Sequence, residues 1–171
     1  MKILVFADFH GSVNSLQQAI EISKREQPDK TVVCGDLFGW SKAQEVVEAV
    51  QKLNGVLYLV KGNNDFSTAQ SYLPCEMEDS ALMYHFNRTL FFTHGDRYNS
   101  MRIPPMLKEG DVLVHGHTHV GRLRIYNGLY IANVGSLARP RDGAPSYVTI
   151  DEQGIALKHA NGEVLQQLNW Q

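Results

Sequence analysis

Near its start the chain reads Ile3-Leu4-Val5-Phe6-Ala7-Asp8-Phe9-His10, an apolar run that ends in a carboxylate and an imidazole. A short apolar run closed by polar residues is typical of a buried strand. Apolar residues then recur near helical spacing, and Ser12 or Asn14 could cap the helix that this spacing predicts. We therefore expect a strand over Ile3–Ala7 that leads directly into a helix.

The same arrangement recurs four times along the chain, since four further apolar runs end in residues that could bind a metal ion. They are Thr31–Cys34 before Gly35-Asp36, Val56–Val60 before Asn63-Asn64-Asp65, Leu90–Thr93 before His94-Gly95-Asp96, and Val112–Val114 before His115-Gly116-His117-Thr118-His119. In α/β sheets, functional groups collect outside the carboxyl ends of the strands. If the five strands share a sheet, all five polar groups meet at one edge.

The order of the elements predicts an α/β fold. In the first half, strands alternate with helices, the second of them over Ala43–Leu53, and this alternation favours a parallel sheet. The second half is rich in short strands, which should form a second sheet packed on the first. Two hairpins are expected there, one turning at Asn87-Arg88-Thr89 and one at Asn127-Gly128, a strong tight-turn signal. No linker is evident, and so we expect a single domain over residues 1–171.

Composition and charge narrow the functional classes. The formal net charge of −2 gives no support for bulk binding to nucleic acid or to a membrane surface. Cys34 and Cys75 are too few for a disulfide framework, and the first apolar run is too short for a signal peptide. No stretch reaches the length needed to span a bilayer. A cytoplasmic protein is therefore expected, and exposed strand edges would allow a homo-oligomer.

The kinds of side chain in the five groups point to metal binding. Carboxylates, imidazoles and an amide occur together, a set that suits divalent ions such as Mn²⁺, Fe²⁺ or Zn²⁺. A structural zinc site is not expected, because paired cysteines are absent. Asp8 and Asp36 would repel each other in one pocket, and two dications would remove that repulsion. Each motif alone also fits a turn or a surface loop, but five of them in order favour the metal site.

This ordered set of motifs resembles the calcineurin-like metallophosphoesterase superfamily. The motifs are Asp8-Phe9-His10, Gly35-Asp36, Gly62-Asn63-Asn64-Asp65, His94-Gly95 and Gly116-His117-Thr118-His119. The short length and the segment Asn133-Val134-Gly135-Ser136 make the chain most similar to the small bacterial and archaeal phosphodiesterases of the YfcE type. The resemblance runs from Met1 to about Pro140. It implies two packed mixed β-sheets flanked by helices, a four-layer α-β-β-α sandwich.

The resemblance also implies a cofactor and an activity. The implied ligands are Asp8, His10 and His119 for one ion, Asn63, His94 and His117 for the other, and Asp36 as the bridge between them. The ions would be two divalent cations, Mn²⁺ in first place, with Fe²⁺, Zn²⁺, Co²⁺ or Ni²⁺ as alternatives. The implied reaction is hydrolysis of a small phosphate diester, by in-line attack of a hydroxide that bridges the two ions.

Further catalytic and substrate-binding residues are expected beside the ligands. Many superfamily members have a histidine after the asparagine ligand that helps to protonate the leaving group, but this chain has Asn64, which cannot supply a proton near neutral pH. Asn64 could still donate a hydrogen bond to a phosphoryl oxygen. Asp65 would fix the tautomer of a ligand histidine, or else form a turn. Arg139 and Arg141 would reach the substrate phosphate, or else lie in a solvated loop.

Two other functions stay open on this evidence. A phosphomonoesterase, including a protein phosphatase, shares the same motifs, although the absence of a built-in acid favours diesters with good leaving groups. The other alternative is a non-catalytic scaffold, since a eukaryotic retromer subunit resembles this fold. Replacement of the metal-binding residues would indicate a scaffold, and here all seven predicted metal-binding residues are present.

Overall fold

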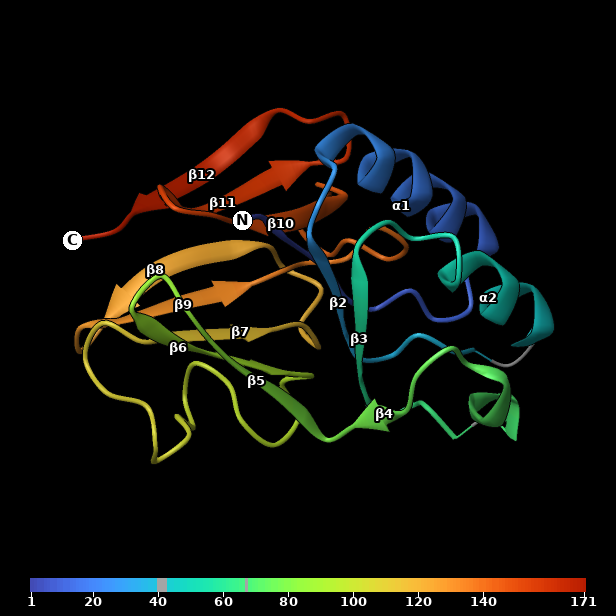
Figure 1. Ribbon diagram of the computed structural model, residues 1–171, viewed down its shortest axis with the longest axis horizontal. Coiled ribbons are helices and arrows are strands. Elements are labelled where there is room, and N and C mark those ends of the chain that lie inside the picture. The colour runs from blue at the N-terminus through green and yellow to red at the C-terminus, as the bar shows by residue number, and fades with distance from the viewer. Residues whose placement is uncertain (40–42, 67) are drawn as a thin grey trace.

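Two β-sheets packed face to face form the centre of the molecule (Figure 1). The computed structural model describes residues 1–39, 43–66 and 68–171. The strands are β1 Ile3–Phe6, β2 Lys30–Cys34, β3 Val56–Val60, β4 Met77–Glu78, β5 Ser80–His85, β6 Arg88–Thr93, β7 Val112–His115, β8 Arg122–Tyr126, β9 Leu129–Asn133, β10 Ser146–Ile150, β11 Gly154–His159 and β12 Val164–Asn169. Seven strands form one sheet, in the order β12-β11-β10-β1-β2-β3-β4, and five form the other, in the order β5-β6-β7-β9-β8.

Both sheets are mixed, as the family resemblance implies. Strands β1 to β4 run parallel in the seven-stranded sheet, and β6, β7 and β9 run parallel in the five-stranded sheet. The five strands that precede the polar motifs therefore do not share one sheet. Three of them (β1, β2 and β3) lie in the first sheet and two (β6 and β7) in the second.

The alternation of side chains along β1 shows how the layers are joined. Ile3 and Val5 pack between the two sheets, whereas Leu4 and Phe6 pack under the helices. All four side chains are fully buried. A strand that is covered on both faces needs a continuous apolar run, and this is why the opening stretch of the chain shows no polar alternation.

Helices α1 (Val13–Glu26) and α2 (Ala43–Val50) cover the outer face of the seven-stranded sheet (Figure 1). Of the two predicted caps, Ser12 is the one used, and its hydroxyl accepts the backbone N–H of Ser15 at 3.3 Å. Helix α2 ends at Val50, three residues before the predicted end, because the chain turns through Gly55 at φ +85° to enter β3. Among the helices that the structure places, none has both the length and the apolar character needed to cross a bilayer.

The outer face of the five-stranded sheet carries no helix in the described ranges. An irregular segment between β6 and β7 covers it and packs Tyr98, Ile103 and Leu107 on an apolar cluster of that sheet. Pro104 and Pro105 disfavour a helix there, because proline lacks an amide proton and restricts the residue before it. The two packed mixed sheets are as predicted, but the fourth layer of the expected sandwich is a loop in this chain.

The five-stranded sheet contains both predicted hairpins. One turn lies where the sequence predicts it, and the other is displaced. β8 and β9 turn at Asn127-Gly128, as predicted, with φ angles of +51° and +75°. β5 and β6 turn at Phe86-Asn87 rather than over residues 87–89, because the pairing of His85 with Arg88 leaves two residues for the turn. The short strand β4 was not predicted, since two residues show no periodicity.

Candidate metal centre

The predicted ligands converge at the carboxyl ends of β1, β2, β3, β6 and β7, and five of them have a left-handed backbone. Residues with a side chain rarely occupy this region. Their φ angles are +59° for Asp8, +48° for His10, +52° for Asp36, +69° for His117 and +62° for His119. Backbone hydrogen bonds fix the first turn, since the N–H of Asp8 donates to the carbonyl of Gly35 at 3.0 Å. Such strain persists where the surrounding structure over-determines it, typically at functional sites.

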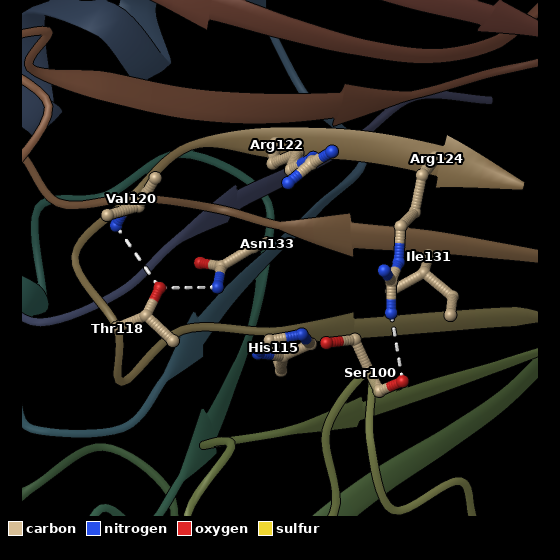
Figure 2. A pocket seen from close by; sticks show the side chains of 8 residues that line it. All are labelled: Ser100, His115, Thr118, Val120, Arg122, Arg124, Ile131 and Asn133. Atoms are coloured by element: carbon tan, nitrogen blue, oxygen red, sulfur yellow. Dashed lines mark hydrogen bonds between the residues drawn. The ribbon is translucent and has the colours of Figure 1, made fainter. Parts of the chain in front are cut away.

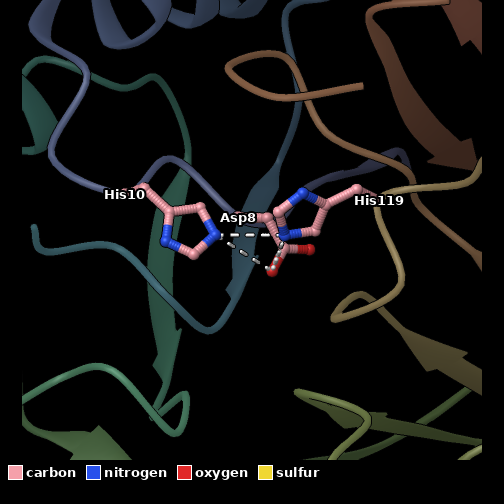
Figure 3. A group of neighbouring side chains, drawn as sticks. All are labelled: Asp8, His10 and His119. Carbon is pink, nitrogen blue, oxygen red and sulfur yellow. Dashed lines mark hydrogen bonds and ion pairs between the residues drawn. The ribbon is translucent and has the colours of Figure 1, made fainter. Parts of the chain in front are cut away.

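Asp8, His10 and His119 form the enclosed cluster (Figure 3). Nε2 of His119 lies 3.4 Å from Oδ1 of Asp8 and 3.1 Å from Nε2 of His10. The other ring nitrogen of His119, Nδ1, donates to the carbonyl oxygen of Arg139 at 3.0 Å, which leaves the Nε2 lone pair for the cluster. Contact with the Asp8 carboxylate raises the pKa of His119, whereas burial lowers the pKa of His10.

Asn63, His94 and His117 form the open cluster, in which Asn63 and His117 are exposed. Nε2 of His94 lies 2.9 Å from Oδ1 of Asn63 and 3.1 Å from Nδ1 of His117. Nδ1 of His94 donates to the carbonyl oxygen of Cys34 at 3.0 Å. The Nε2 lone pair of this buried imidazole therefore also faces its cluster.

Asp36 joins the two clusters. Its Oδ2 lies 3.6 Å from Nε2 of His10 and 3.5 Å from Nε2 of His94. Asn64 holds the carboxylate in this position, since its backbone N–H donates to Oδ1 at 2.9 Å and its side-chain amide donates to Oδ2 at 2.8 Å. The structure thus brings all seven predicted ligands together, with Asp36 in the middle.

A divalent cation fits this set of donors. Oδ1 of Asp8 is buried and, within the described residues, has no hydrogen-bond partner. The only ion pairs of Asp8 and Asp36 in the described ranges are with histidines, and none is with a lysine or an arginine. Buried carboxylates without a counter-charge are costly. Carboxylate, imidazole and amide groups are ligands that first-row divalent ions accept.

Two glycines permit the close packing around the carboxylates. A Cβ atom at Gly62 would collide with the backbone nitrogen and Oδ1 of Asp36, and one at Gly116 would collide with Asp8 and Ala7. Glycine is therefore required by space at both positions. The motifs Gly-Asn and Gly-His-Thr-His owe their first residue to this contact.

Asp65 ties two loops together and does not orient a histidine. Its Oδ1 accepts the N–H of Phe38 at 2.9 Å and its Oδ2 accepts the N–H of Gly62 at 2.8 Å. Burial raises the pKa of Asp65 to about 6. Of the two roles expected for Asp65, these contacts fit the turn. The carbonyl groups of Cys34 and Arg139, and not Asp65, accept from the ring nitrogens of His94 and His119.

Arg139 and Arg141 flank His119 through the backbone. The carbonyl of Arg139 accepts from His119, and the N–H of Arg141 donates to the carbonyl of His119 at 2.9 Å. Both side chains are exposed, and neither forms a salt bridge with another described residue. This exposure is compatible with both expected roles, contact with a substrate phosphate and a place in a solvated loop.

A pocket of about 280 Å³ opens beside the open cluster. It is lined by Lys61, Gly62, Asn63, Phe66, Asp79, Asp96 and Arg97. Phe66 is 80% exposed, so an aromatic ring is available on the wall of a pocket that includes a predicted ligand. Asp96, which belongs to the fourth motif, lies in this pocket and not in either cluster.

Sequence reasoning missed the groups that support the ligands. The hydroxyl of Ser136 donates to the carbonyl of Asp8 at 2.8 Å and accepts the N–H of Arg139 at 2.9 Å, and so it links β1 to the loop behind His119. The motif Asn133–Ser136 is a signal that could have identified Ser136. The carbonyl groups of Cys34 and Arg139 carry no such signal, because every residue has a carbonyl.

The two-sheet fold and this set of candidate ligands are those expected of a metal-dependent hydrolase of phosphate esters. The sequence profile of the calcineurin-like phosphoesterase superfamily domain matches residues 1–154. The chain belongs to this superfamily, and this membership implies a divalent metal ion.

Individual relatives agree with this membership. The phosphodiesterase YfcE of Escherichia coli (strain K12) is 27% identical over 175 residues, which cover 95% of this chain and 94% of the relative. The phosphodiesterase MJ0936 of Methanocaldococcus jannaschii is 23% identical over 90% of this chain and 94% of its own length. The solved structure of YfcE, a phosphoesterase from E. coli, matches with a TM-score of 0.90 at 24% identity over 100% of both chains. Wild-type Vps29 of Entamoeba histolytica, complexed with zinc, matches with a TM-score of 0.66 at 16% identity over 100% of both chains. The structural matches show a shared fold.

Proposed function

We propose that this protein is a phosphodiesterase that uses two divalent metal ions. The observation that carries the proposal is the position of Asp36, whose Oδ2 lies 3.6 Å from Nε2 of His10 and 3.5 Å from Nε2 of His94. One carboxylate oxygen at nearly equal distances from two imidazoles is the arrangement that a bridging ligand needs. The relatives named as phosphodiesterases support the same reaction class.

In this proposal the enclosed cluster holds one ion, the open cluster holds the other, and Asp36 bridges them. Mn²⁺ is the first candidate, and Fe²⁺, Zn²⁺, Co²⁺ and Ni²⁺ suit the same ligands. When bound, the ions supply an activated water, whose pKa falls to roughly 7, and neutralise charge on the phosphoryl oxygens.

The residues of the chain itself bind and orient the substrate. Asn63 and His117 are exposed and border the approach to Asp36. A phosphate ester that enters there places its oxygens toward Arg139 and Arg141, which can bind them in a bidentate manner. In-line attack puts the leaving alcohol opposite the attacking water, and the pocket beside Asn63 offers about 280 Å³ for that group.

Asn64 favours esters with good leaving groups, and the relatives named as phosphodiesterases favour diesters among them. Its amide donates to Asp36 at 2.8 Å, and an amide cannot protonate a departing alkoxide near neutral pH. Aryl diesters need little protonation, because their leaving groups are already stable anions.

The test compares bis-p-nitrophenyl phosphate with p-nitrophenyl phosphate under identical metal conditions. We expect the diester to turn over, fastest with Mn²⁺, and the monoester to react weakly. A faster reaction with the monoester would identify a phosphomonoesterase of the same superfamily instead. Absence of turnover with Mn²⁺, Fe²⁺, Zn²⁺, Co²⁺ and Ni²⁺ would contradict an enzyme and favour a scaffold.

Elemental analysis tests the number of ions. We expect the wild-type protein to hold two ions per chain at saturation. His117→Ala should keep the ion of the enclosed cluster, because its ligands are shielded from water, whereas His119→Ala should lose that ion first. A wild-type protein that saturates with one ion would contradict the two-metal assignment.

We also propose that residues 1–171 form one domain, since both sheets supply ligands to the same site. A single cooperative unfolding transition is expected in calorimetry. Two well-separated transitions would contradict this proposal.

A further inference from the structure

A second polar site lies on the outer face of the five-stranded sheet. Strand pairing places His115, Asn133 and Arg122 in one row across β7, β9 and β8. The next row consists of Leu113, Ile131 and Arg124. The residues between them, such as Val114, Ala132 and Leu123, pack between the two sheets, and so both rows face outward.

All the residues of these two rows except Leu113 line a pocket of about 250 Å³ (Figure 2). The pocket is lined by Ser100, His115, Thr118, Val120, Arg122, Arg124, Ile131 and Asn133. Two of these residues carry a positive charge, and none of them carries a carboxylate. In the part of the chain that the structure describes, neither Arg122 nor Arg124 forms a salt bridge.

One nitrogen of the Arg124 guanidinium has a hydrogen-bond acceptor, whereas another has none among the described residues. A terminal nitrogen donates to the carbonyl oxygen of Ser100 at 2.9 Å, and the guanidinium carbon lies 5.3 Å from the ring centre of Tyr126. Its Nε is buried and has no hydrogen-bond partner among the described residues. A buried cationic donor without an acceptor is costly unless a ligand or water supplies one.

His115 provides a buried acceptor in the same pocket. The side chain is 2% exposed, and its Nδ1 donates to the carbonyl oxygen of Gly116 at 3.0 Å. This bond leaves Nε2 of the neutral imidazole as an acceptor, and within the described ranges this atom has no partner. Asn133 is already occupied, because its amide nitrogen donates to Oγ1 of Thr118 at 2.6 Å. The unsatisfied groups of the pocket are therefore cationic donors and one neutral acceptor.

We propose that this pocket binds a phosphate group that carries one proton. The charged oxygens of monohydrogen phosphate, or of a monoprotonated phosphomonoester, accept from Arg122 and Arg124, and the P–OH group donates to Nε2 of His115. No metal ion takes part in this contact. The pocket shares Thr118 with the segment that carries His117 and His119, but its occupant lies on the outer sheet face and is held by a separate set of side chains.

The experiment is a ¹H–¹⁵N NMR titration of the full chain loaded with diamagnetic Zn²⁺. The probes are inorganic phosphate, phenyl phosphate and sulfate, and the readouts are the backbone amides of Val120 and Ile131 and the Nε–H of Arg124. We expect saturable shifts with phosphate. Sulfate, which has no proton near neutral pH, should bind about tenfold more weakly, because it cannot make the hydrogen bond to His115. Phenyl phosphate distinguishes a site for free phosphate from one that also accepts the phosphorylated end of an organic molecule.

Variants separate the pocket from bulk electrostatics. Arg122→Gln removes an exposed side chain and should abolish the saturable shifts without affecting the fold. Arg102→Gln removes the same charge from an exposed residue outside the pocket lining and should leave the shifts unchanged. His115→Phe should reduce the preference for phosphate over sulfate to near unity.

Two results would overturn the proposal. One is the absence of saturable shifts at Val120 and Ile131 with all three anions, and the other is an equal loss of binding in Arg102→Gln and Arg122→Gln. Asp36→Asn is expected to retain these shifts, so that failure of the metal site and failure of this pocket are told apart.

Discussion

Two sets of buried carboxylates in this molecule are compensated in different ways. Glu26, at the last residue of α1, is 8% exposed and accepts from Tyr147 at 2.7 Å, Lys158 at 2.9 Å and Lys2 at 3.2 Å. Asp8 and Asp36 are 0% and 2% exposed, and their ion-pair partners among the described residues are histidines alone. The chain therefore neutralises one carboxylate with its own cations and leaves the other two to an external charge.

This difference separates a carboxylate that stabilises the fold, Glu26, from two carboxylates that are proposed to bind metal ions, Asp8 and Asp36. Removing one partner from a satisfied buried ion network destabilises the protein, because the remaining charges lose their compensation. Removing a carboxylate that is held ready for a metal ion should affect metal binding and catalysis far more than folding. Each of the following predictions tests or sharpens this contrast.

The largest effect is expected for Asp36→Asn. An amide in place of the bridging carboxylate weakens both proposed ion sites at once, and we expect the turnover of bis-p-nitrophenyl phosphate to fall by at least about 100-fold. Steady-state kinetics at saturating Mn²⁺ measure the change. Asp151→Asn is the matched control, since the carboxylate of Asp151 accepts the N–H of Gln153 in a turn near the opposite end of β1. A near-normal rate in Asp36→Asn would refute the bridging role.

Metal ions should stabilise the wild-type protein by relieving the uncompensated charge. At a free ion concentration about 100 times the dissociation constant, binding to the folded state contributes roughly 2.7 kcal/mol. For a chain of this size the midpoint of thermal unfolding should rise by roughly 5–10 °C. Differential scanning calorimetry with Mn²⁺ and with a chelator measures the shift. Asp8→Asn should show a clearly smaller shift, and an equal one would mean that the ions act elsewhere.

Glu26→Gln should lower the free energy of unfolding by about 2 kcal/mol with little change in turnover. Burial opposes the charged form of Glu26, but the hydrogen bonds from Lys158, Tyr147 and Lys2 outweigh it and lower its pKa below the ordinary 4.5. Because the folded-state pKa is lowered, the stabilisation is fully present above pH 4.5 and is lost as the pH falls through the folded-state value.

Urea denaturation at several acidic pH values tests whether the stabilisation by Glu26 is lost as the pH falls. The difference in stability between the wild type and Glu26→Gln should be constant near neutral pH and should shrink below about pH 4.5. A difference that grows toward acid pH, or a large loss of turnover in the variant, would contradict the separation between the two sets of carboxylates.

The sequence predicts only part of the contrast between Glu26 and the pair Asp8 and Asp36. The motif order identifies Asp8 and Asp36 because each follows an apolar run, and carboxyl ends of parallel strands gather functional groups. The network of Glu26 has no local signal, since its partners lie 24, 121 and 132 residues away along the chain. Long-range pairing of this kind depends on the tertiary fold.

Backbone conformation and strand order set the other limits of prediction. The left-handed φ angles of Asp8, His10 and His119 oppose the intrinsic preference of these residues, and only tertiary contacts enforce them. The outer-face pocket also escaped prediction, because Arg122 and His115 meet only through β9, which pairs with both β7 and β8. Hydrophobic periodicity predicts strands, but it does not state which strands are neighbours.

The smallest effect is expected at Asn64, which supports Asp36 and carries no charge of its own. Asn64→Ala removes the hydrogen bond of 2.8 Å from the side-chain amide to Oδ2 of Asp36, while the backbone N–H bond to Oδ1 remains. Loss of one partner around a metal-binding carboxylate should lower turnover about tenfold. The loss should be the same for aryl and alkyl diesters, because the amide does not protonate the leaving group. Asn64→His adds a group that can do so, and it should raise the rate with alkyl diesters relative to aryl ones. If Asn64→Ala instead slowed alkyl diesters selectively, the amide would contribute to departure of the leaving group, and its role would not be confined to holding the carboxylate.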